Sequence, residues 1–121
     1  MAGYHDHDDL MYLDDLKEAA PREFAAWARL DGVVGRQDGA IPQKYRELIA
    51  VASAHITQCV YCLDVHTRAA VEAGASKAEV AESALIAAAL RAGGAGAHAA
   101  LTMRLYDQHS ADRTAAEAKS A

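Results

Sequence analysis

Apolar side chains recur at helical spacing along most of the chain, and no run alternates between apolar and polar residues in the manner of a strand. Pro21 and Pro42 suit the first turn of a helix, where a proline loses no hydrogen bond that the helix needs. The pattern therefore predicts an all-α protein. We expect about six helices, over residues 10–20, 21–31, 41–57, 59–73, 76–92 and 95–109.

Local signals set the expected helix ends. Gln58 stands between two periodic segments and indicates a break, and Gly74 is typical of a left-handed helix stop. Ser76 followed by Glu79 forms a capping box, which predicts a helix start at the serine. The pair Gly93-Gly94 predicts the end of one helix before the last one begins.

The length of 121 residues is that of one domain. We expect it to span residues 10–110, with flexible ends over 1–9 and 111–121. Apolar residues make up 52% of the chain, but many are alanine and only 6% of residues are aromatic. Since alanine buries little area, the core should be thin. This composition predicts further burial between subunits of an oligomer.

The formal charge of −5 and the absence of a Lys/Arg cluster argue against a nucleic-acid-binding surface. No run is expected to span a membrane, and the polar, acidic first ten residues are unlike a secretory signal. The sequence therefore predicts a cytoplasmic protein. Thiols stay reduced in that compartment, so a C-x-x-C pair there indicates redox or metal chemistry.

The candidate chemistry lies in residues 59–66, which hold both cysteines, Cys59 and Cys62, and end at His66. Both cysteines fall in the first turn of an expected helix, where free backbone N–H groups stabilise a thiolate. His66 lies four residues after Cys62, on the same helical face, where an imidazole can take the thiol proton. Two thiols at this spacing can form a reducible disulfide after one is oxidised by a peroxide.

Two other interpretations of this stretch stay open. The cysteines can be inert core residues beside a satisfied histidine. They can also bind zinc together with His66, with His55, His98 or Glu47 as the fourth ligand, although the chain has no second ligand pair. A further His/Asp tract at residues 5–9 is either a metal-binding tract or a solvated end.

The residues outside the cysteine stretch are less informative when taken alone. Glu47 lies among apolar neighbours on the preceding helix, and composition alone favours an exposed carboxylate there. If it is buried, its pKa is raised and it can pass protons. His55 and His98 lie on small or apolar faces, where a histidine is more often a core residue than a catalytic one.

The spacing of Glu47, Cys59, Tyr61-Cys62 and His66 resembles the alkylhydroperoxidase D-like branch of the carboxymuconolactone decarboxylase family. The resemblance covers about residues 42–100, roughly half the chain. It continues through Ala70, Glu72 to Ala75, Glu79 to Glu82, Ala87 to Ala95 and His98.

The resemblance implies an alkylhydroperoxidase D-like helical fold and an intertwined homo-oligomer, commonly a trimer or a hexamer. Carried over by position, Cys62 attacks the peroxide, Cys59 resolves the product, and Glu47 and His66 form the proton relay. Some family members have a histidine in the relay where this chain has Tyr61. Decarboxylase members lack the cysteine pair, so lactone decarboxylation is not expected.

We therefore expect an antioxidant thiol peroxidase that needs no cofactor and no metal beyond its redox-active cysteines. Its partners would be a hydroperoxide and an external thiol or lipoyl-type reductant. Tyr61, His55 and His98 are candidate supporting residues around the site. Two alternatives stay open: a thiol-disulfide oxidoreductase with little peroxidase activity, and a non-catalytic, metal-binding helical oligomer.

Overall fold

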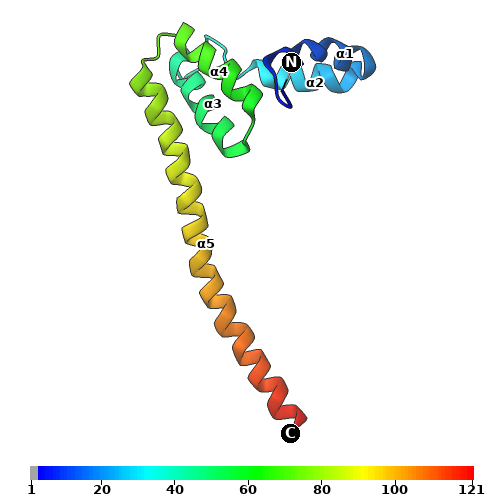
Figure 1. The fold of residues 1–121 in the computed structure, drawn as a ribbon, viewed down its shortest axis with the longest axis vertical. Coiled ribbons are helices and arrows are strands. Elements are labelled where there is room, and N and C mark those ends of the chain that lie inside the picture. The colour runs from blue at the N-terminus through cyan, green and yellow to red at the C-terminus, as the bar shows by residue number, and fades with distance from the viewer. Residues whose placement is uncertain (1–2) are drawn as a thin grey trace. The chain divides into compact units, whose positions relative to one another are not determined.

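The computed structural model describes residues 3–121, and within that range all regular structure is helical, as predicted. A short 3-10 helix opens the chain and five α-helices follow (Figure 1). Their bounds are η1 His7–Tyr12, α1 Leu13–Ala19, α2 Pro21–Gly32, α3 Gln43–Thr57, α4 Val60–Glu72 and α5 Lys77–Ser120.

The chain divides into two compact units, which meet within α5 between Ala88 and Ala89. In the first unit, α1 packs against α2, and α3 and α4 form a closely packed helical hairpin. The start of α5 is tied to α3 by two polar contacts. The Ser83 hydroxyl donates to the Leu48 carbonyl at 2.6 Å, and Lys44 pairs with Glu79 at 3.0 Å. The second unit consists of the remainder of α5.

Three of the predicted helix ends are confirmed by their backbone geometry. Gln58 adopts the left-handed conformation (φ 58°) and ends α3, and Gly74 does the same (φ 90°) after α4. The capping box is complete, because the Ser76 hydroxyl accepts from the Glu79 N–H and the Glu79 carboxylate accepts from the Ser76 N–H. Gln58 thus sets the short turn between α3 and α4 that leads into Cys59, whereas Gly74 and Ser76 set the connection between α4 and α5.

The predicted break at Gly93-Gly94 is wrong, since α5 continues through both glycines to Ser120 as one helix. A glycine inside a helix costs only about 1 kcal/mol relative to alanine, and the alanines on either side favour the helix. The predicted sixth helix is therefore the second part of α5. Residues 111–120, predicted as a flexible tail, are helical here, and their mobility stays a prediction.

The first predicted helix, over residues 10–20, is also corrected. The chain turns as 3-10 helix from His7 to Tyr12 before α1 begins at Leu13. Asp6 caps this segment with a capping box of its own, in which Asp9 accepts from the Asp6 N–H at 3.0 Å. Local hydrogen bonds from aspartates therefore start the turn earlier than the apolar spacing indicates.

The core of the described chain is as thin as the composition predicts. The buried apolar residues are one valine and three alanines, Val51, Ala54, Ala70 and Ala87. Many large apolar side chains stay exposed, and every residue from Ala88 to Ala121 is exposed in the single chain. A helical segment that carries apolar side chains and leaves them exposed is typical of a partner-binding element.

Within residues 3–121, one helix, α5, is long and apolar enough to cross a membrane by length and composition alone. This finding differs from the expectation that no run reaches the length of a membrane span. Only 6% of the apolar window is buried inside the chain. An alanine- and glycine-rich composition of this kind is found in membrane-spanning helices and also in helices that pack against a partner subunit.

Candidate active site

A buried carboxylate and a histidine form the centre of the site. Glu47, in α3, is only 4% exposed, and its Oε2 lies 2.7 Å from Nδ1 of His66 in α4. An ionised carboxylate only accepts hydrogen bonds, so towards an ionised Glu47 the Nδ1–H of His66 is the donor. The structure therefore brings together the two residues predicted as a proton relay, and the carboxylate of Glu47 fixes the orientation of the imidazole through Nδ1.

The two cysteines lie at the start of α4, and both are free thiols. Cys59 is the helix N-cap, and its sulfur accepts from the backbone N–H of Cys62 at 3.2 Å. A backbone donor of the helix N-terminus thus binds the sulfur of Cys59. This arrangement was not anticipated, because the spacing alone does not tell which of two neighbouring sulfurs receives the backbone donor.

Burial raises the pKa of the Cys62 thiol to about 11, and the hydrogen bond to Cys59 and the electrostatic interactions with Cys59 and Asp31 act in the same direction. The predicted acidity is therefore wrong for Cys62 in this state. At neutral pH Cys62 is a protonated thiol, and it needs a base to react as a nucleophile.

An open hollow of about 490 Å³ gives solutes access to the site. Cys62 and His66 both line it, and Cys59 and Glu47 do not. The rest of its wall is mainly apolar and comes from α3 and the α2–α3 loop: Val33, Val34, Ile41, Arg46, Ile49, Ala50, Ser53, Ala54 and Thr57. A small molecule in this hollow would meet the thiol of Cys62 and the imidazole of His66 together.

Tyr61 contacts the N-terminal segment. Its hydroxyl donates to Asp9 at 2.6 Å, and its ring packs edge-on against His5. The hydrogen bond to Asp9 is the main reason that the pKa of Tyr61 rises to about 12. His7 pairs with Asp64 one turn further along α4. Tyr61 therefore anchors η1 to α4, and its hydroxyl is already engaged outside the Glu47–His66 pair.

His98 lies in the second unit, where its ring Nδ1 contacts the Gly94 carbonyl one turn back at 2.9 Å. His55 lies on α3, in its last turn. Across the described residues 3–121, no three His, Cys, Asp or Glu side chains are grouped to hold a metal ion. Neither the zinc interpretation nor the His/Asp metal tract therefore gains support from the geometry.

Gly35 is a residue of the site that the sequence does not single out. A Cβ atom at this position would lie 2.7 Å from Oε1 of Glu47. The backbone of the α2–α3 loop therefore closes over the carboxylate at a distance that only glycine permits. Nothing in the local sequence signals this approach, because it depends on how α3 packs beneath the loop.

Comparison with known proteins identifies the family of this chain. A sequence model of the carboxymuconolactone decarboxylase family matches residues 21–104, well over half of the chain. The chain belongs to this family. Among curated proteins, it is 41% identical over 71 residues to "Uncharacterized protein 4 in cox locus" of Paracoccus denitrificans. That match covers 59% of this chain and 64% of the relative, so the chain spans less than two thirds of that protein.

Membership of the carboxymuconolactone decarboxylase family agrees with the all-helical architecture, and the match includes every residue of the candidate site. The family includes both decarboxylases and peroxidases. Which chemistry this member performs must therefore come from its own side chains.

Proposed function

We propose that this protein is a thiol-dependent peroxidase of the alkylhydroperoxidase D-like type. One observation carries the proposal: Cys62 and His66 line the same hollow, and the buried Glu47 orients His66 through a hydrogen bond of 2.7 Å between Oε2 and Nδ1. A cysteine beside a histidine that a carboxylate orients is the arrangement by which cysteine enzymes activate their nucleophile.

The reaction runs in two steps. His66 takes the proton of Cys62, and the sulfur attacks the outer oxygen of the hydroperoxide, so that an S–O bond forms and the O–O bond breaks. The departing alkoxide takes the proton back from His66 and leaves as an alcohol. The thiol of Cys59 then attacks the sulfenic acid of Cys62, a disulfide forms, and water leaves.

An external dithiol of the lipoyl type returns the disulfide to two thiols and is itself oxidised to a disulfide, which balances the two electrons given to the peroxide. This cycle needs a compartment that keeps the reductant reduced, and we therefore propose a cytoplasmic protein. The mainly apolar wall of the hollow suits a hydroperoxide with an organic group.

A second candidate function, thiol-disulfide exchange with little peroxidase activity, is favoured by the raised pKa of Cys62 and by the position of Tyr61. A thiol with a pKa of about 11 attacks peroxide slowly unless His66 removes its proton. The phenol that replaces the relay histidine of some family members is bound to Asp9 and does not assist.

A single-turnover experiment tests the proposal and separates the two functions. Fully reduced protein is mixed with one equivalent of cumene hydroperoxide and no reductant. We expect one peroxide consumed per subunit and a Cys59–Cys62 disulfide seen by peptide mass spectrometry. If peroxide and thiols persist while glutathione disulfide oxidises the same pair, the oxidoreductase alternative holds and the peroxidase proposal fails.

We also propose that the protein works as a homo-oligomer, a trimer or a hexamer, whose subunits bury the exposed part of α5. In the second unit, Leu90, Leu101 and Leu105 follow one helical face at spacings that bring Gly94 and Ala97 between them. All of these residues are exposed in the single chain. This apolar face needs a partner to exclude water.

The expected result for the wild type is a molar mass of three or six subunits by light scattering. Replacing Leu101 and Leu105 by glutamine should lower that mass. Replacing the exposed Arg113 and Glu117, which pair with each other near the end of α5, by glutamine should leave it unchanged. A monomeric wild-type protein would contradict the proposal.

A further inference from the structure

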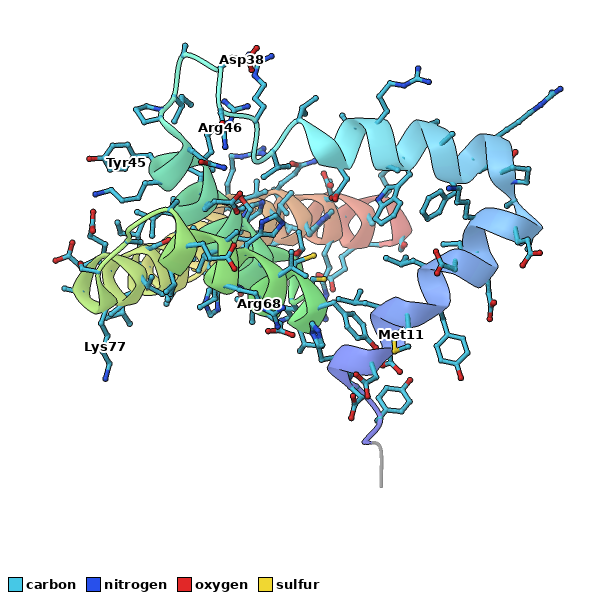
Figure 2. All side chains as sticks on the ribbon, turned by 90° about the horizontal axis from the view of Figure 1, so that it is seen from above. Met11, Asp38, Tyr45, Arg46, Arg68 and Lys77 are labelled. Carbon is cyan, nitrogen blue, oxygen red and sulfur yellow. The ribbon has the colours of Figure 1, made fainter. Side chains whose placement is uncertain are left out.

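Arg46 precedes Glu47 in α3, but its side chain binds the α2–α3 loop. Its Nε donates to the Val34 carbonyl at 2.8 Å, and its Nη2 donates to the Val33 carbonyl at 2.8 Å. Figure 2 shows Arg46 beside the loop that carries Asp38. These two carbonyls directly follow α2, which ends at Gly32, so the guanidinium binds the negative end of that helix.

Gln43, one turn earlier on α3, also binds a carbonyl of the α2–α3 loop. Its Nε2 donates to the Gly35 carbonyl at 3.1 Å. Three successive carbonyls, those of residues 33, 34 and 35, are therefore bound by two side chains of a single helix. A loop would normally satisfy its carbonyls with water, so this arrangement fixes residues 33–35 to α3.

The fixed loop lies against one carboxylate oxygen of Glu47, and His66 contacts the other. The Gly35 Cα is so near that a Cβ would lie 2.7 Å from Oε1 of Glu47, whereas Oε2 faces His66. Val33 and Val34 also form part of the wall of the hollow that Cys62 lines. The burial of Glu47 thus depends on a loop whose position depends on Arg46.

We propose that Arg46 is a positioning residue: it holds residues 33–35 as a cover that keeps water from the Glu47–His66 pair and so sets the reactivity of Cys62. The inference rests on the proposed function, because it assigns Glu47 and His66 their role towards the thiol. In water, the attraction between a carboxylate and an imidazolium falls severalfold, and His66 would then become a weaker base for Cys62.

The test measures the rate at which iodoacetamide alkylates Cys62 in the reduced protein, located by tandem mass spectrometry. We expect Glu47→Gln to slow this rate about tenfold and Arg46→Met about threefold to tenfold, and the double variant to be no slower than Glu47→Gln. Arg46→Lys should lie between wild type and Arg46→Met, since lysine supplies a charge without the two-pronged donor. The assay contains no peroxide, so it gives a result even if peroxidase activity is absent.

A purely structural role for Arg46 would give a different result, in which Arg46→Met slows alkylation by the same factor in the Glu47→Gln background. That additivity, or an unchanged rate in Arg46→Met, would overturn the proposal. Arg36→Met is the control from the same loop, because the Arg36 side chain is half-exposed and its ion pair, at 3.9 Å, is with the exposed Asp38. It should leave the rate unchanged.

Gly35→Ala is a second route to the same result if Arg46→Met does not fold. The added methyl group would push the loop away from Glu47 and should slow alkylation of Cys62 only while Glu47 is present. Hydrogen exchange at residues 33–36 should rise in both variants, while the amides of α4 stay protected. Equal slowing by Gly35→Ala with and without Glu47 would also overturn the proposal.

Discussion

Replacing Cys62 by serine should lower the rate of peroxide consumption, measured with a dithiol reductant in excess, by at least about a thousandfold. Loss of a catalytic nucleophile removes the covalent pathway, and in well-studied hydrolases the same kind of change costs up to about 10⁶ in rate. Cys62 is the cysteine that lines the hollow, so it is the sulfur a peroxide would meet first. Serine keeps the shape of the side chain and leaves the Glu47–His66 pair in place.

The matched control is Cys59→Ser, which keeps the attacking sulfur and removes the resolving one. The first turnover should then survive, and a sulfenic acid should accumulate at Cys62 and oxidise further to the sulfinic acid. Dimedone labelling followed by mass spectrometry detects the first product. If Cys62→Ser consumes peroxide as fast as the wild type, or if the sulfenic acid forms at Cys59 in the wild type, the assignment of the two sulfurs is wrong.

The helix boundaries next to the site could be predicted because they depend on short-range interactions. A capping box such as Ser76 with Glu79 satisfies its own backbone groups within one turn, and Gly74 adopts its left-handed conformation at little cost. The predicted break at Gly93-Gly94 was wrong because no such short-range interaction ends the helix there. Glycine permits a break, but a break forms only where the chain gains by turning, and the surrounding alanines give no such gain.

The electrostatics of the site could not be predicted from spacing. Both cysteines fall near the N-terminus of α4, yet the backbone N–H of Cys62 donates to the sulfur of Cys59. Cys62 is instead partly buried against α3, and burial outweighs the helix end in setting its pKa. Which effect dominates depends on the depth of a side chain to within a few ångströms, and that depth comes from tertiary packing.

The burial of Glu47 also could not be predicted from the local sequence. Composition favours an exposed carboxylate at this position, and only the resemblance to the family indicated a site residue. The structure buries it through two contacts with segments distant in sequence, His66 on α4 and the backbone at Gly35. Neither contact leaves a periodic signature, because each joins one residue of α3 to one residue elsewhere.

Glu47→Gln tests whether this carboxylate contributes its charge to the reaction or only its shape. The amide has nearly the same size and its oxygen can still accept from Nδ1 of His66, so fold and orientation should persist. The negative charge that stabilises the imidazolium disappears, however. We expect kcat for peroxide reduction to fall about a hundredfold, which is the smaller end of the range for general acid–base catalysis, with little change in KM.

Two further variants separate charge from packing. Glu72→Gln removes an exposed carboxylate at the end of α4 and should leave kcat unchanged. Glu47→Ala leaves the histidine without its buried partner and should lower the free energy of unfolding by about 3 kcal/mol in urea titrations, whereas Glu47→Gln should change it much less. Equal kcat values for Glu47→Gln and wild type would show that His66 needs only a hydrogen-bond acceptor. The proton relay would then consist of the imidazole alone, because transfer of the Cys62 proton to His66 would not need the negative charge of Glu47.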